Sequence, residues 1–330
     1  MKRHCFYLLL LIPMSAMAQT AGKQSFQFLN AASTARLAAL GGVNVSLTDE
    51  DINFLFTNPA LVGDTLNYWA SASYQFYVAD IGEATFVYGQ KFKKIGMLSM
   101  GVQHFSYGDI KGYDASGMPT GDYKSGETSL YISKSHQINN FRLGVNLKGV
   151  FSNLAGYRAN ALMLDIGGTF IHPKKNFTVG MVMRNIGFVL SNYSSTSNTK
   201  VPLDLQVGST FKPEHMPLRF SLTAYDLMSS NVTYMQSGEK GGTFDKVLRR
   251  FNFGTEILFH RNAELMIGYN YRVHQELKLS SGGSGAGITF GIMAKIKSIN
   301  FSFSRSGFVA GSAGYTFTLA ANTQNFLTRR

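Results

Sequence analysis

The stretch Leu66–Phe76, with the sequence LNYWASASYQF, alternates apolar and polar side chains along its whole length. One face carries Leu66, Tyr68, Ala70, Ala72, Tyr74 and Phe76, and the other carries Asn67, Trp69, Ser71, Ser73 and Gln75. A period of two residues is that of a β-strand. The stretch therefore predicts a strand with one face toward lipid or a protein core and the other toward water.

The same period recurs almost to the end of the chain. We count fourteen such segments, near residues 66–76, 82–92, 95–106, 126–137, 141–151, 160–171, 177–185, 203–211, 218–226, 248–259, 263–272, 286–296, 299–306 and 312–322. Most are close to the ~9–11 residues that a tilted strand needs to cross a bilayer. Aromatic residues make up 13% of the chain and charged residues only 15%, a balance that fits β structure in contact with lipid.

The connections between these segments alternate between short and long. Short turns are expected at residues 93–94, 139–140, 172–176, 212–217, 260–262 and 297–298, and longer loops at 107–124, 152–159, 185–202, 227–247 and 273–285. The short connections near 77–81 and 307–311 break this rule. Short turns at one end, longer loops at the other and an even number of strands are typical of outer-membrane barrels, which have both termini on the periplasmic side. The predicted fold is an all-β, transmembrane, antiparallel up-and-down barrel of fourteen strands.

The segment Phe26–Leu61, which precedes the strands, has a different character. Its run Ala31–Leu40 predicts a short helix that begins after Asn30 or Ser33 and ends at Gly41-Gly42. The proline of Asn58-Pro59 disfavours a helical conformation at Asn58. We interpret residues 19–65 as a helical hatch that plugs a barrel formed by 66–330; a tether or a small separate subdomain is the alternative.

The first eighteen residues predict a secretory signal peptide. Lys2 and Arg3 precede an apolar run, and Ala16-Met17-Ala18 has the small residues of a cleavage site, so Gln19 is the expected mature N-terminus. Cys5 is the only cysteine, so the mature protein forms no intramolecular disulfide. Cleavage leaves 29 Lys and Arg against 19 Asp and Glu, a net charge of +10. These cations are scattered singly, a distribution that argues against nucleic-acid binding.

Several charged residues lie on the polar face of the predicted strands. Charges are tolerated in a watery or plugged lumen and are costly against lipid. We therefore expect a basic inner wall, to which the acidic hatch residues Asp49, Glu50 and Asp51 bind. The expected lumen cations are Arg142, Lys148, Arg184, Arg219, Arg272 and Lys295, with Asp204, Glu256 and Glu264 among them.

No motif for catalysis, cofactor binding or metal binding stands out. The histidines are far apart, and no nucleophile elbow is present. We expect a protein that is not an enzyme and that has no catalytic, cofactor or metal site. The long loops instead carry aromatic residues and methionine, which are either docking contacts for a partner or part of an aromatic girdle. These residues are Tyr107, Tyr113, Met118, Tyr123, Tyr234 and Phe244.

The hatch and the strands together resemble the FadL-like outer-membrane barrels. The residues that carry the resemblance are Ser33, Ala35, Arg36, Ala39-Leu40-Gly41-Gly42 and Asn58-Pro59-Ala60-Leu61, with Arg184-Asn185-Ile186-Gly187 and Gly268-Tyr269-Asn270-Tyr271 as further matches. Within that superfamily the opening Phe26–Asn30 and the run Ala39–Ser46 are most similar to the PorQ family, part of the type IX secretion system of Bacteroidetes.

The resemblance implies a non-enzymatic anchor for a PorZ-like surface protein, in a complex with PorU-like and PorV-like components. The alternative is transport of a hydrophobic small molecule, as in the fatty-acid carriers. The chain lacks the long helical surface loops that would capture such a ligand, and its predicted inner face is charged.

Overall fold

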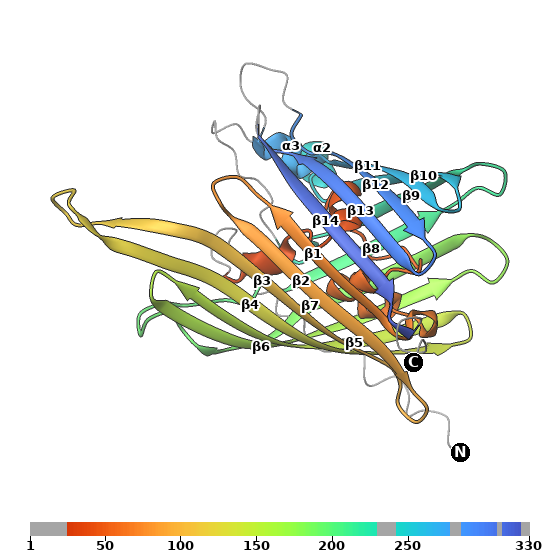
Figure 1. Ribbon diagram of the computed structural model, residues 1–330, viewed down its shortest axis with the longest axis horizontal. Coiled ribbons are helices and arrows are strands. Elements are labelled where there is room, and N and C mark those ends of the chain that lie inside the picture. The colour runs from red at the N-terminus through yellow and green to blue at the C-terminus, as the bar shows by residue number, and fades with distance from the viewer. Residues whose placement is uncertain (1–24, 230–241, 278–284, 309–311, 325–330) are drawn as a thin grey trace.

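The computed structural model describes residues 25–229, 242–277, 285–308 and 312–324. The expected signal peptide, Cys5 and Gln19 lie outside these residues. Fourteen antiparallel strands close into a barrel in which β1 pairs with β14 (Figure 1), and the predicted fold class is confirmed. The strands are β1 Trp69–Phe76, β2 Gly82–Phe92, β3 Gly96–Tyr113, β4 Pro119–Ile138, β5 Phe141–Leu154, β6 Tyr157–Ile171, β7 Phe177–Ser191, β8 Asp204–Phe211, β9 Leu218–Ala224, β10 Phe251–His260, β11 Ala263–Asn270, β12 Ile288–Ile296, β13 Ile299–Gly307 and β14 Ala313–Asn322.

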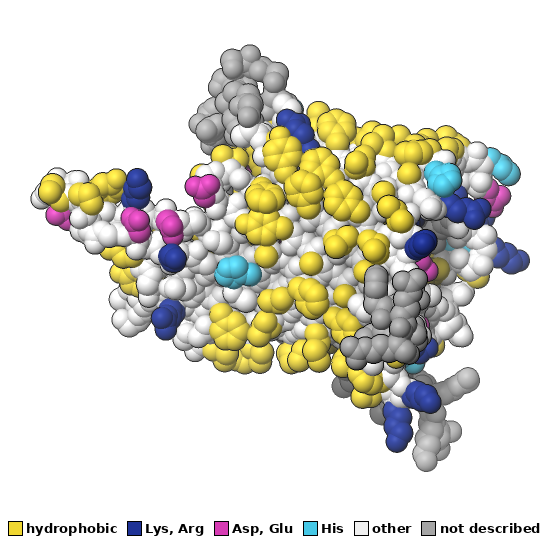
Figure 2. Space-filling model, in the orientation of Figure 1, with side chains coloured by type: hydrophobic (Ala, Val, Ile, Leu, Met, Phe, Trp, Pro, Cys, Tyr) yellow, Lys and Arg dark blue, Asp and Glu magenta, His cyan; other side chains and the backbone are white. Residues whose placement is uncertain are grey.

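The two faces of the wall differ in chemistry. On β5, Leu143, Val145 and Leu147 are exposed on the outside, whereas Asn146 and Lys148 are buried inside. Figure 2 shows that apolar side chains spread over the visible outer surface, while many charged side chains lie near its two ends. An apolar outside around a polar lumen is the pattern of a barrel that crosses a bilayer. No helix among the described residues is long and apolar enough to do so.

The barrel has a turn end and a loop end. At the turn end, short connections such as Asn139-Asn140 join the strands, and the first strand residue Trp69 pairs with Asn322. The first described residue, Ser25, lies at the loop end, where its N–H donates to the carbonyl of Lys200 (2.9 Å). The described chain therefore enters the lumen at the loop end and reaches the wall at the turn end.

The hatch, residues 26–66 in the structure, contains short helical elements joined by irregular segments. The expected helix over Ala31–Leu40 is shorter than predicted, and its N-cap is Thr34, whose hydroxyl accepts from Leu37 N–H. The helix ends where expected, because Gly41 and Gly42 have φ of 88° and 93°. The helical elements of the hatch are η1 Gln27–Asn30, α1 Ala35–Ala39, η2 Ile52–Phe56, η3 Pro59–Leu61 and η4 Asp64–Leu66.

The predicted loop over 107–124 is wrong. Strands β3 and β4 continue through it and form a hairpin that projects past the neighbouring strands (Figure 1). Its cross-strand pairs include Asp109 with Lys124 and Lys111 with Asp122, so opposite charges face each other. Strands beyond the bilayer need no apolar alternation, and this is why the pattern did not reveal them.

Other predicted loops also contain regular structure. The loop over 152–159 is a two-residue turn, Ala155-Gly156, with φ of 50° and 89°, as in a tight hairpin. Strand β7 continues to Ser191. Helices α2, Thr243–Leu248, and α3, Tyr271–Leu277, lie in the two remaining loops, of which residues 230–241 and 278–284 are outside the described residues.

A charge on the outer face tests the membrane orientation of the wall. Ile166 is half exposed near the middle of β6, and Tyr157 is exposed at its loop end. We expect Ile166→Arg to lower the free energy of unfolding by about 2–4 kcal/mol, and Tyr157→Arg by about 0–1 kcal/mol, because the cost of a charge depends on depth. Urea unfolding in lipid vesicles measures both. Equal costs at the two positions would contradict this orientation.

Candidate functional site

The hatch lies in the lumen and is held by hydrogen bonds from the wall. Its short turns leave carbonyls without helical partners, and buried carbonyls need donors. Asn252 donates to the carbonyls of Leu40 (2.8 Å) and Val43 (2.7 Å), and Thr289 donates to Ala39 (2.7 Å). The inward polar side chains of the barrel therefore serve as hydrogen-bond partners for an irregular segment.

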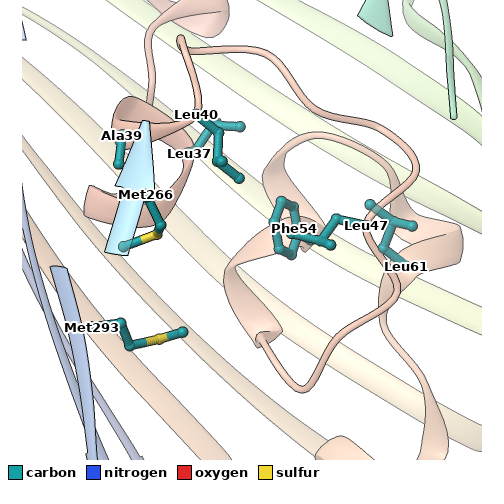
Figure 3. Close-up of a cluster of buried hydrophobic side chains, with 8 residues drawn as sticks. All are labelled: Leu37, Ala39, Leu40, Leu47, Phe54, Leu61, Met266 and Met293. Carbon is teal, nitrogen blue, oxygen red and sulfur yellow. The ribbon is translucent and has the colours of Figure 1, made fainter. Parts of the chain in front are cut away.

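Apolar contacts also hold the hatch against the wall. Leu37 and Ala39 of α1 and the following Leu40 pack with Met266 of β11 and Met293 of β12 in one buried cluster. Figure 3 shows Met266 beside Ala39 and Leu37, with Phe54 and Leu47 on the other side of the cluster. The unbranched methionine side chains suit such an irregular gap between hatch and wall.

Arg36 is the electrostatic centre of the hatch. Its Nη2 lies 2.8 Å from both Asp49 Oδ2 and Glu256 Oε1, and its side chain is only 2% exposed. Asp51 Oδ2 lies 3.8 Å from Arg36 Nη1, and Glu264 Oε2 lies 3.6 Å from Arg36 Nη2. One cation of the hatch thus joins two carboxylates of its own segment to two carboxylates of the wall. We call this group, with Arg219 and Lys295, the Arg36 cluster.

The carboxylates of the Arg36 cluster differ in environment. Burial alone would raise the pKa of Asp49, but Arg36 and Arg219 outweigh it and hold that pKa well below its usual range. Burial raises the pKa of Asp51 in spite of Arg36. Burial would lower the pKa of Arg36, yet the four carboxylates raise it well above its usual value. Asp49 and Arg36 are therefore held as a charged pair.

The remaining hatch residues of the sequence motif have structural contacts. The carbonyl of Ser33 accepts from Thr85, and Asn58 donates to Val45 and caps Ala60 N–H. Pro59-Ala60 lies against Gly144 of β5, where a Cβ atom would come within 2.4 Å of Ala60 N. This close approach explains why a small residue occupies the wall at that point.

The expected lumen cations do not form a single basic wall. Arg219 binds Glu256 and Asp49, Lys295 binds Glu264, and Lys148 is fully buried against Asp165. Arg142 and Arg184 donate to hatch carbonyls, Arg142 to Leu61 and Arg184 to Leu29 and Phe56. Arg272 is not on a strand, since it lies in α3 and pairs with Asp226. Of the hatch acids, Asp49 pairs with the wall cation Arg219, Asp51 pairs with Arg36, and Glu50 is exposed.

A chamber remains between the hatch and the loop end of the wall. Its volume is about 340 Å³, and a neighbouring polar cavity of about 120 Å³ shares Tyr225 and Arg272 with it. The Arg272 guanidinium lies over the Tyr225 ring at 4.7 Å, and the Tyr225 hydroxyl donates to Asn270 (2.9 Å). The chamber is lined by Gln27, Asn30, Ala32, Ala38, Gly41, Gly42, Val43, Gln75, Tyr77, Tyr225, Asn270, Arg272, Val273, Gly287, Thr289, Ser306, Gly307 and Phe308.

Most chamber residues were not identified from the sequence as site residues. They come from the loop ends of β1, β11, β12 and β13, from α3 and from the hatch, segments far apart in the chain. Gly41, Gly42 and Arg272 were expected as site residues for other reasons, and Asn270 lies within the Gly268–Tyr271 motif. Among the described residues no group of three His, Cys, Asp or Glu side chains could hold a metal ion.

The expected docking residues are only partly in loops. Tyr107, Tyr113 and Tyr123 lie on strands of the projecting hairpin, and Met118 lies in its turn. Tyr113 and Met118 are 60% and 64% exposed, whereas the Tyr107 hydroxyl donates to Glu127. Phe244 is exposed on α2, and Tyr234 lies outside the described residues.

Comparison with solved structures supports the fold. A deltaS2 mutant of the TodX monoaromatic hydrocarbon channel aligns with TM-score 0.53 and 13% identity, over 88% of this chain and 97% of that chain. The deltaS2S3 mutant of TodX aligns with TM-score 0.51 and 13% identity, over 88% and 98%. No protein-family model matches the chain, and no curated protein matches it significantly. At this identity the likeness shows a shared barrel fold.

The Arg36 cluster makes a quantitative prediction. Arg36→Ala leaves Glu256 buried with one fewer cation, so we expect the free energy of unfolding to fall by about 3–5 kcal/mol. The matched control is Lys91→Ala, which breaks an exposed pair with Asp64 (2.7 Å) and should cost about 0–1 kcal/mol. Urea unfolding of both variants in vesicles measures the difference. If Arg36→Ala lowers the free energy of unfolding no more than Lys91→Ala does, the Arg36 cluster does not hold the hatch in the lumen.

Proposed function

We propose that the chain is an outer-membrane channel in which a small, mostly apolar molecule binds in the chamber above the hatch. The chamber itself is the observation that carries the proposal. Ala38, Val43, Val273 and Phe308 contribute apolar walls, and polar side chains such as Gln75 and Arg272 lie between them. Concave sites of ~300–1,000 Å³ that combine apolar walls with polar groups are typical of small ligands. At about 340 Å³ the chamber suits a molecule about the size of one or two rings.

Location in the outer membrane is part of the proposal. The apolar outer face, the even number of strands and the short turns at one end support it. The resemblance to FadL-like barrels and the shared fold with a monoaromatic hydrocarbon channel support a transport role. A secretory signal peptide over residues 1–18 would bring the chain to this membrane.

Passage requires a movement, because the hatch fills the lumen below the chamber. The Arg36 cluster and the apolar cluster of α1 lie between the chamber and the turn end. A molecule that binds in the chamber therefore crosses only if the hatch or the adjacent wall shifts. The resemblance implies a movable hatch of this kind.

Blocking the chamber tests the transport function. Ser306 lines the chamber and is buried, so Ser306→Trp should fill it and reduce uptake of labelled toluene by at least about tenfold, or about 1.4 kcal/mol. The measurement uses a strain that lacks the chain and is complemented with parent or variant. Leu319→Trp, on the outer face, is the control and should keep parental uptake. Equal uptake by the folded Ser306→Trp variant and the parent would contradict the proposal that the molecule passes through the chamber.

A second candidate function is anchoring of a surface protein, as in the PorQ family of the type IX secretion system. The observation that favours it is the projecting β3–β4 hairpin, which exposes Tyr113 and Met118 beyond the apolar belt. Large exposed aromatic and methionine side chains are common in protein interfaces. The expected partner is a PorZ-like surface protein, in a complex with PorU-like and PorV-like components.

Truncation of the hairpin aromatics tests the anchoring function. Truncation of a buried aromatic at an interface typically costs at least about 2 kcal/mol, which is ~30-fold in affinity. The loss of even one such anchor in the Tyr113→Ala, Tyr123→Ala double variant should therefore weaken the complex at least ~30-fold. Tyr157→Ala, an exposed tyrosine at the short β5–β6 turn, is the control. Pull-down of surface proteins from detergent extracts measures binding, and heat modifiability on a gel reports folding. A folded double variant that retains its partner would exclude the hairpin as the anchor.

A further inference from the structure

Three side chains with complementary chemistry meet inside the wall near the loop end. Lys148 of β5, Asp165 of β6 and Asn185 of β7 are all completely buried. The Lys148 Nζ lies 2.7 Å from Asp165 Oδ1 and also donates to the side-chain oxygen of Asn185. An amine, a carboxylate and a carboxamide are therefore in mutual contact and shielded from water.

A bulge in β7 places the carboxamide. The pairing of β6 and β7 shifts between Leu164 and Ile166, and Asn185 has a φ of 60°. Its N–H donates to Asp165 Oδ1 (2.8 Å), and Arg184 and Asn185 are both buried although they are consecutive. A regular strand would point one of them outward, so the bulge turns Asn185 toward Lys148.

The surroundings hold each group in position. Asn146 Nδ2 donates to Asp165 Oδ2 (3.2 Å), and Asn185 Nδ2 donates to the carbonyl of Pro202 (2.8 Å). The Tyr131 ring lies 5.7 Å from Lys148 Nζ and covers the amine. Such fixed geometry gives an intramolecular reaction a high effective concentration, and complete burial of the three side chains keeps solvent from competing for the carboxamide.

We propose that Lys148 and Asn185 become joined by an isopeptide bond, with Asp165 as the acid–base group. The Lys148 ammonium gives a proton to Asp165, and the neutral Nζ attacks the side-chain carbonyl carbon of Asn185. The N–C bond forms and the bond from that carbon to Nδ2 breaks. The proton held by Asp165 passes to the departing nitrogen, and Asp165 then accepts the second proton that Nζ loses as it becomes an amide N–H. One ammonia is released for each bond, so the step needs no oxidant, reductant or added group.

The cross-link would span three neighbouring strands. It would join β5 to β7 across β6 at positions 37 residues apart. The same lumen contains a second lysine–carboxylate contact that provides a comparison. Lys295 Nζ lies 2.7 Å from Glu264 Oε1, a carboxylate, and its side chain is 28% exposed. Lys295 should therefore remain a free amine.

Mass spectrometry of the full chain, purified in detergent, denatured and digested with trypsin, tests this inference. Because trypsin does not cut after an acylated lysine, residues 143–158 should appear linked to residues 185–200. The linked mass should be lower than the sum of the two peptides by one ammonia, about 17 Da. The peptide that ends at Lys295 should be unmodified. Recovery of 143–148 and 185–200 as separate peptides would overturn the proposal.

Two variants test the roles of the residues. Lys148→Arg removes the nucleophile and Asp165→Asn removes the acid–base group, so the linked peptide should be absent from both. Heat modifiability before digestion shows which variants fold. A linked peptide in folded Asp165→Asn protein would exclude the role given to Asp165. If neither variant folds, the digest of the parent chain decides the proposal alone.

Discussion

The buried backbone of the hatch is the constraint on which the rest of this structure depends. The hatch contains only short helical turns, so many of its carbonyls have no partner within the segment. A buried backbone group without a partner costs about 1–3 kcal/mol. Donors such as Asn252, Thr289 and Arg184 therefore project inward from the strands. The polar side chains of the lumen supply hydrogen-bond partners for the hatch, and the apolar side chains of the outer face contact the bilayer.

Buried charges also need partners, and a buried charge without a partner is more costly than a buried carbonyl without one. A charge removed from water is tolerated only with partners and satisfied hydrogen bonds. Arg36 meets this requirement with carboxylates from both the hatch and the wall, and Lys148 meets it with Asp165 and Asn185. Because these groups and the α1 cluster occupy the lumen below, the chamber remains at the loop end. The two candidate functions use different surfaces, since a ligand would bind in the chamber and a protein partner would bind the hairpin.

Strand pattern was most informative where the strand meets lipid. The predicted segment 82–92 coincides with β2, whereas 95–106 ends well short of Tyr113 in β3. Inside the apolar belt, the polar lumen on one side and lipid on the other impose alternation. Beyond it, both faces of a hairpin are wet, and pairs such as Asp109 with Lys124 stabilise strands that have no apolar face. The extended hairpin and the tight Ala155-Gly156 turn were therefore mistaken for loops.

The sequence by itself determined the number of strands, the face that each turns inward, and the end of α1 at Gly41-Gly42, because these follow from period-two patterning and from local backbone preference. It also indicated that the hatch acids pair inside the barrel. Charged side chains of the wall are costly against lipid, so they face the lumen, where the hatch lies. Only the tertiary structure decided which charges meet. Arg36 and Glu256 are 220 residues apart, and Lys148 meets Asn185 because of a bulge in β7. Such meetings depend on barrel closure and strand register, which bring together residues whose separation in the chain carries no signal.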